Sequence, residues 1–284
     1  MSRLTELVEK ADAGVTGAAK ALMKLYVYDR PDDITQSEGV TIACKWYDRW
    51  IELLQAKADK GDSTDKRNLA DILFFGNGLP EEVWDCFTAN DRANALRQSI
   101  KLYKEIVVSD EPFCMKDEAW YMMGQAYKKL ADFKKAFTCF KKAAVLDYSE
   151  AFAMVGDAYL DGKGVEKNLV KARQWFRKGA DMGDITATLK LADCYKRGIG
   201  CKVDYSKAME EYLHIAERTG RYWEKYADSI GTALYEIGNI YMNGLGVGID
   251  LKKAYHYFKL AVKKGNLDAE NALNGDNRFK NFAK

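Results

Sequence analysis

Residues 151–184 read AFAMVGDAYLDGKGVEKNLVKARQWFRKGADMGD, and the same pattern returns twice further along the chain. Residues 187–220 read ATLKLADCYKRGIGCKVDYSKAMEEYLHIAERTG, and residues 233–266 read ALYEIGNIYMNGLGVGIDLKKAYHYFKLAVKKGN. The small residue Gly156 lies three residues before Tyr159. The other two segments have a small residue and a tyrosine at the equivalent positions, Ala192 with Tyr195 and Gly238 with Tyr241. Such self-similarity indicates stacked supersecondary units that share one core.

Each unit has the pattern of a helix, a loop and a second helix. Val155 and Tyr159 lie four residues apart and therefore share one face of the first helix. Ala172 and Phe176 have the same spacing in the second helix, where a small residue allows contact and an aromatic ring fills the gap. Glycines such as Gly162 end the first helix, because glycine accepts the left-handed conformation at a helix cap.

The combination of a Gly-x-Gly loop, a Lys-Ala pair and a following aromatic residue resembles the Sel-1-like repeat. This family is related to the tetratricopeptide repeat but has a longer loop. The Lys-Ala pairs are Lys171-Ala172, Lys207-Ala208 and Lys253-Ala254. The resemblance implies an all-α, right-handed superhelical solenoid of about six antiparallel helix pairs.

The segments before and after these repeats differ from them. Residues 117–150 resemble an ordinary tetratricopeptide repeat, with Trp120, Gly124 and Tyr127 in the first helix and no glycine loop. We therefore predict degenerate N-terminal repeats over 1–116, one tetratricopeptide-like repeat over 117–150, three Sel-1-like repeats over 151–273, and a polar tail over 274–284. The degenerate part is expected to carry two extended loops, at 29–39 and 80–90, where a specific function would have been added.

The composition favours a soluble interaction protein over a nucleic-acid or membrane protein. The chain has 44 basic and 42 acidic side chains, whereas a nucleic-acid-binding protein usually shows a basic excess. No stretch approaches the roughly 20 apolar residues of a membrane helix, and residues 1–10 lack the apolar centre of a signal peptide. The six cysteines are irregularly spaced and are expected to be reduced. We therefore predict a cytoplasmic protein.

Residues suited to catalysis or metal binding are scarce. The two histidines, His214 and His256, lie 42 positions apart, and no zinc or phosphate-loop motif is present. Gly162-Lys163-Gly164 lacks the spacing of a phosphate loop and follows a predicted helix. We predict no catalytic residues, no metal and no cofactor.

The position after the small residue of each first helix is polar throughout the repeats. If the family geometry holds, the first helices line a concave groove and this row points into it. We predict a partner-binding groove of polar, aromatic and apolar residues from this row and the neighbouring turns. They are Asp71, Tyr121, Gln125, Lys128, Asp157, Leu189, Asp193, Lys196, Tyr235, Asn239 and Met242. Tyrosine is frequent at interface hot spots, so Tyr121 and Tyr235 are the expected anchors.

The resemblance implies a scaffold or adaptor that binds a partner protein or peptide, with bacterial signalling, secretion-associated or toxin-neutralising roles among those of the family. The alternative is a secreted, cell-wall-related or penicillin-binding member with weak enzymatic activity. Those members carry one cysteine on each helix of every repeat, a pattern that this chain does not follow. Free thiols favour the scaffold, whereas three disulfides would favour the alternative.

Overall fold

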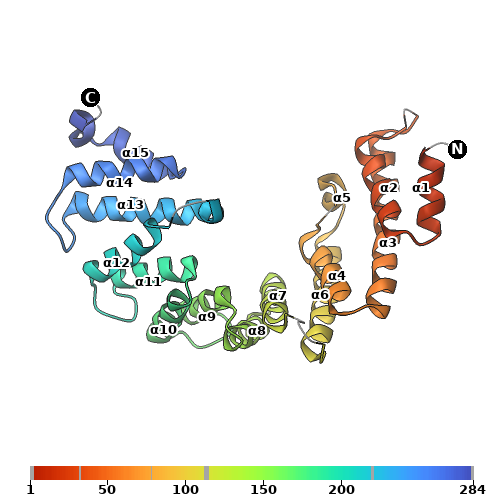
Figure 1. Cartoon of the computed structure of the whole chain (residues 1–284), viewed down its shortest axis with the longest axis horizontal. Helices are drawn as coiled ribbons and strands as arrows, with labels where there is room; N and C mark the ends of the chain where they lie inside the picture. The colour runs from red at the N-terminus through yellow and green to blue at the C-terminus, as the bar shows by residue number, and fades with distance from the viewer. Residues whose placement is uncertain (1–2, 32, 78, 112–114, 219–220, 283–284) are drawn as a thin grey trace. The chain divides into compact units, whose positions relative to one another are not determined.

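The computed structural model describes residues 3–31, 33–77, 79–111, 115–218 and 221–282, and within these ranges every regular element is helical (Figure 1). The helical fold expected from the repeats is thereby confirmed. Contacts divide the chain into an N-terminal unit, Met1–Leu146, and a C-terminal unit, Asp147–Lys284, and each is described by itself. No helix in the described ranges is both long enough and apolar enough to cross a membrane.

The N-terminal unit consists of three helix pairs with two additional helices. The pairs are α2 with α3, α4 with α6, and α7 with α8. The helices run, in order, α1 (Arg3–Asp12), α2 (Thr16–Tyr28), α3 (Gln36–Lys60), α4 (Ser63–Phe75), α5 (Glu81–Asp85), α6 (Ala89–Val108), α7 (Lys116–Lys129) and α8 (Phe133–Val145).

The C-terminal unit repeats this arrangement with three further pairs, α9 with α10, α11 with α12, and α13 with α14. Successive first helices also contact each other: α9 contacts α11, and α11 contacts α13. The elements are α9 (Ser149–Asp161), α10 (Leu169–Asp181), α11 (Ile185–Arg197), α12 (Tyr205–Ala216), η1 (Arg221–Tyr226), α13 (Ala227–Asn243), α14 (Leu251–Lys263), α15 (Leu267–Gly275) and η2 (Asn277–Phe282).

Close packing within a pair depends on the small residue of the first helix. Gly156 on α9 faces Phe176 on α10 so closely that a methyl group on Gly156 would lie 2.3 Å from the ring. Phe176 is fully buried. Because protein cores are packed to crystal-like density, a ring held this close leaves no room for a side chain. The equivalent contacts in other pairs are Gly124 with Phe140 and Gly238 with Phe258.

A Lys-Ala motif lies at the start of the second helices α8, α10, α12 and α14. The carboxylate of Asp204 caps α12 by accepting a hydrogen bond from the Lys207 backbone at 3.0 Å. The Lys207 ammonium group lies 2.9 Å from Asp204 Oδ2 and 5.8 Å from the centre of the Tyr195 ring. One lysine therefore joins the cap to the first helix of its own pair. The equivalent lysine–tyrosine contacts are Lys135–Tyr127, Lys171–Tyr159 and Lys253–Tyr241.

The glycine loops join successive pairs of the C-terminal unit. Gly200, with φ of 67°, lies against the backbone of Leu169 at the start of α10, where a methyl group would be 2.3 Å from the carbonyl oxygen. Arg173 Nε donates to the carbonyl of Gly200 at 3.2 Å. Gly246 occupies the same position against Tyr205 at the start of α12. The second glycine of the loop is thus needed for contact between repeats as well as for the turn.

The expectations for the two insertions need correction. The predicted loop at 29–39 is too long, because the Thr35 and Glu38 side chains form a capping box and α3 already begins at Gln36. The insertion at 80–90 forms α5 and the start of α6. In the tail, Phe279 is 1% exposed and packs on Phe258, so η2 closes the end of the C-terminal core.

Candidate partner-binding surface

The residues predicted to form the groove all lie on first helices. Asp71 lies on α4, and Tyr121, Gln125 and Lys128 lie on α7, all in the N-terminal unit. Those of the C-terminal unit lie on α9 (Asp157), α11 (Leu189, Asp193 and Lys196) and α13 (Tyr235, Asn239 and Met242). Each is at least partly exposed. The partners of these side chains distinguish positions with an internal role from positions open to a ligand.

Asp71 is engaged by its own helix pair. The hydroxyl of Tyr103, on α6, donates a hydrogen bond to Asp71 Oδ1, and Arg67 Nε lies 3.7 Å from Asp71 Oδ2. Burial and the neighbouring carboxylate raise the pKa of Tyr103 above its usual range, so its proton stays in place. The Asp71 carboxylate therefore satisfies a buried tyrosine.

Asp193 has the same role in the C-terminal unit. Tyr212 Oη, on α12, donates to Asp193 Oδ1 at 2.6 Å, and burial raises the Tyr212 pKa above its usual range. Lys196 Nζ lies 3.5 Å from Asp193 and 2.8 Å from Glu236 of α13. Lys196 thus joins two first helices through their carboxylates.

Asp157 is also paired across first helices. Its carboxylate on α9 lies 2.9 Å from the ammonium group of Lys190 on α11. Lys190 and Lys196 together place positive charge on α11 between carboxylates of α9 and α13. Leu189 is half-buried beside this network. At these positions the first-helix face of the C-terminal unit carries three carboxylates and two lysines, and because both lysines are paired within the unit, charge there is a poor means of attracting a partner.

In the N-terminal unit, Gln125 and Tyr121 are joined to each other. Gln125 Nε2 donates to Tyr121 Oη at 2.8 Å, and the Tyr121 ring packs 5.7 Å from the centre of the Phe140 ring. Lys128 is exposed in the last turn of α7. On α7, Gln125 and Tyr121 therefore form a hydrogen-bonded pair, and Lys128 adds an exposed positive charge.

The predicted residues of α13 differ from the others. Tyr235 packs one face against Phe258, with 5.7 Å between ring centres, and remains half-exposed. Neither its hydroxyl nor the side-chain amide of Asn239 has a hydrogen-bond partner among the residues that the structure describes. Met242 lies one turn further along and is also half-exposed. Residues at these spacings share one helix face, so α13 presents an aromatic ring, an amide and a flexible apolar side chain together.

Two residues that contribute to this face were absent from the predicted set, namely Lys190 and Glu236. Each directly follows a predicted groove residue, Leu189 or Tyr235. Their role arises from ion pairs between neighbouring helices. Only the opposite charges on successive first helices could have signalled it in the sequence.

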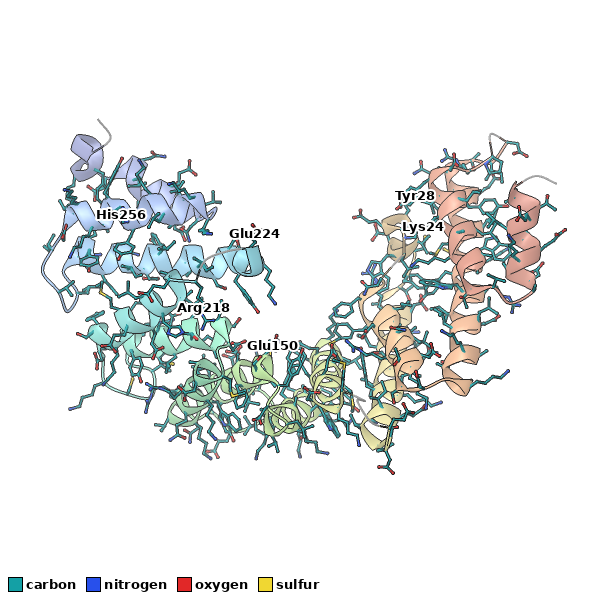
Figure 2. The ribbon with its side chains drawn as sticks, in the orientation of Figure 1. Lys24, Tyr28, Glu150, Arg218, Glu224 and His256 are labelled. Atoms are coloured by element: carbon teal, nitrogen blue, oxygen red, sulfur yellow. The ribbon has the colours of Figure 1, made fainter. Side chains whose placement is uncertain are left out.

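One of these first helices, α11, begins at a buried carboxylate. Asp184 caps α11 and is 6% exposed. Burial raises its pKa to about 6, although a hydrogen bond from the Ala187 backbone opposes the shift. Glu150, in the first turn of α9 (Figure 2), raises this pKa further through its negative charge. The protonation of Asp184 is therefore coupled to the stability of the C-terminal core.

Groups that could support metal or acid–base chemistry are dispersed in the described residues. No cluster of three or more His, Cys, Asp or Glu side chains suited to a metal ion occurs there. His214 contacts Arg218, and His256 (Figure 2) lies edge-on to the Tyr257 ring; both histidines are exposed. The described cysteines carry free thiols, and Cys114 lies outside the described residues.

A family model described as the Sel1 repeat matches residues 119–148, 149–184, 185–210 and 231–266. The chain contains four Sel1 repeats. They confirm the resemblance drawn from the Lys-Ala and glycine-loop motifs. The first of the four falls within 117–150, which we predicted as an ordinary tetratricopeptide repeat; there α7 and α8 are joined without a glycine loop.

Known proteins with related sequence match less than half of this chain. The alginate biosynthesis protein AlgK of Azotobacter vinelandii is 32% identical over 120 residues, which are 42% of this chain and 24% of that protein. The chitin synthase regulatory factor 1 of Schizosaccharomyces pombe is 30% identical over 122 residues, 42% of this chain and 25% of that protein. The chain therefore spans about a quarter of the length of these curated relatives.

Two solved structures share the fold. A protective antigen of uropathogenic Escherichia coli displaying an SLR fold aligns with a TM-score of 0.57 and 23% identity, over 96% of this chain and 59% of that one. A Sel1 repeat protein from Oxalobacter formigenes aligns with a TM-score of 0.56 and 22% identity, over 83% of this chain and 87% of that one. At this level of identity the alignments establish the helix-pair solenoid alone.

Proteins built from Sel1 repeats generally mediate protein–protein interactions and generally lack enzymatic activity. Neither the family model nor these relatives supports the secreted, penicillin-binding alternative.

Proposed function

We propose that this protein is an interaction scaffold whose C-terminal unit binds an extended segment of a partner protein along the first-helix face of α9, α11 and α13. The observation that carries the proposal is that α13 presents hydrogen-bonding groups that the described part of the fold does not use. Within the described ranges, the Tyr235 hydroxyl and the Asn239 amide have no internal partner, whereas Asp157 and Asp193 on the same face are engaged in the fold.

The chemistry of this face favours a neutral, extended peptide. A side-chain amide carries both a donor and an acceptor, so Asn239 can pair with both groups of one peptide unit. Tyr235 supplies an aromatic anchor at low entropic cost because Phe258 already restrains its ring. Met242 adds an adaptable apolar contact. Since Lys190 and Lys196 are paired with carboxylates, we expect affinity to depend weakly on salt.

The test compares variants in affinity capture from the native cell, followed by titration of the captured partner. Tyr235→Phe combined with Asn239→Ala removes both open polar groups and keeps the ring that packs on Phe258. We expect about tenfold weaker binding, the effect of losing one to two hydrogen bonds at an interface. The control replaces the exposed Lys252 and His256 of α14 with alanine. Equal partner affinity of the α13 variant and the wild type would refute this placement.

A cytoplasmic location remains part of the proposal. Fractionation of the native cell followed by immunodetection tests it, and recovery of the protein outside the cytoplasmic fraction would exclude it.

A further inference from the structure

The N-terminal unit contains a hollow on its second-helix side that the proposed function does not use. The hollow has a volume of about 460 Å³ and lies between α3 and α6. Ile51, Leu73 and Phe87 form its apolar floor, and Asp48, Glu52 and Asp91 contribute carboxylates to its lining. The three acids are exposed. An apolar floor with an acidic rim is amphipathic.

The insertion at 80–90 builds one end of this hollow. Val83 is fully buried in the core of α2 and α3, and α5 contacts α3 directly. The Phe87 ring packs edge-on against Tyr47, with 5.0 Å between ring centres. Thr88 and Asp91 then form a capping box that starts α6. The segment that departs from the repeat pattern is therefore fixed in place, and its Phe87 side chain faces the hollow.

The carboxylates of the acidic rim are only partly paired with positive charges of the N-terminal unit. Asp48 and Glu52 lie one turn apart on α3, where like charges repel. Arg49 contacts Glu52 at 3.2 Å, but Asp48 has no ion-pair partner in the described part of the chain. Burial and the charge of Glu52 raise the pKa of Asp48. A cation placed beside both carboxylates would relieve this repulsion and gain two charge-assisted contacts.

We propose that this hollow docks a basic, amphipathic segment of a partner protein. A lysine or arginine of that segment lies between Asp48 and Glu52, and an adjacent apolar side chain covers Ile51 and Phe87. Charge complementarity with the acidic rim selects this occupant over an acidic peptide or a nucleic acid, both of which the rim repels. The apolar floor selects it over a purely cationic peptide.

The test uses the full chain and three labelled peptides in fluorescence anisotropy. One peptide is an amphipathic sequence of leucine and lysine, the second replaces lysine with glutamate, and the third replaces leucine with glycine. We expect the leucine–lysine peptide to bind the tightest, with hydrogen-exchange protection at 47–52 and 91–98. Tighter binding of the glutamate peptide, or equal binding of the glycine–lysine peptide, would contradict the proposal.

A charge-matched pair of variants assigns the binding to the rim. Asp48→Asn with Glu52→Gln removes two carboxylates from the hollow, whereas Glu9→Gln with Asp12→Asn removes two exposed carboxylates from α1. We expect about tenfold weaker binding for the first variant and unchanged binding for the second. Equal loss in both, or protection confined to other helices, would overturn the proposal. The α13 variant leaves this peptide binding unchanged, so the two proposals fail separately.

Discussion

Tyr212 on α12 donates a hydrogen bond of 2.6 Å to Asp193 on α11, and Asp193 is the residue that follows the small position of that helix, Ala192. The pair α4–α6 repeats the relationship with Tyr103, Asp71 and Ala70. Pairs with glycine at the small position have phenylalanine instead, as Gly156 and Phe176 do. The small residue and the aromatic residue therefore vary together within this one chain, whereas an acid also follows glycine at Asp157.

We expect Tyr212→Phe to destabilise the C-terminal unit by about 1–2 kcal/mol, because a buried hydrogen bond to a charged acceptor is lost. Asp193→Asn should cost less, since an amide oxygen still accepts the bond. Urea unfolding of Tyr212→Phe, Asp193→Ala and the double variant gives the coupling between the side chains, because each of these single variants removes the bond.

A coupling energy near zero would mean that the hydroxyl and the carboxylate act independently, contrary to the structure.

Gly156→Ala tests the close approach of α9 and α10. A methyl group would meet the Phe176 ring at 2.3 Å, so the ring or the helix must move, at a cost of about 1–3 kcal/mol. Gly248→Ala is the matched control because no atom lies within 4 Å of the position that its methyl group would take. Thermal unfolding compares the two; a melting temperature of the Gly156 variant equal to wild type would show that the core accommodates the group.

The repeat pattern was sufficient to predict the helix pairs, because glycine caps, small residues and aromatic residues act locally or between neighbouring helices. The ends of the insertions were less predictable. The capping box of Thr35 and Glu38 places Gln36 in a helix, although the flanking sequence looks like a loop. Which residues of the 80–90 insertion are buried could not be predicted from the sequence, because Val83 packs against helices that are distant along the chain.

The candidate surface was predictable in position but not in chemistry. The row of polar residues does lie on first helices. Its members looked equivalent in the sequence, yet Asp71 and Asp193 satisfy buried tyrosines while the Asn239 side chain has no partner among the described residues. The difference depends on the aromatic residue of the second helix and on charges of the next repeat. Neither is visible from a first helix alone.

Asn168→Asp should slightly stabilise the start of α10. Asn168 caps this helix, but Lys171 above Tyr159 lacks the ion pair that Lys207 forms with Asp204. Asparagine and aspartate cap helices about equally well, so the gain is that of one exposed ion pair, about 0.2–1 kcal/mol. Chemical denaturation at low and high salt measures it. A gain that persists unchanged at high salt would point to a cause other than the ion pair.

Asp184→Asn should make the C-terminal unit more stable above neutral pH and leave it little changed in acid. The Asp184 pKa is raised from 3.8 to about 6, mainly by burial. Folding therefore favours the protonated form. The stability that Asp184 contributes is fully present below about pH 3.8 and is lost as the pH rises through about 6. A shift of this size corresponds to at most about 3 kcal/mol. Asparagine keeps the cap but cannot ionise.

Urea unfolding of the wild type and the Asp184→Asn variant, at about pH 8 and about pH 4, measures the difference. Glu150→Gln should produce a smaller change in the same direction, because it removes the carboxylate that raises the Asp184 pKa. Asp181→Asn, which alters an exposed acid at the end of α10, should not reproduce it. If the Asp184 variant gained equally at both pH values, improved capping rather than relief of a buried charge would be the cause.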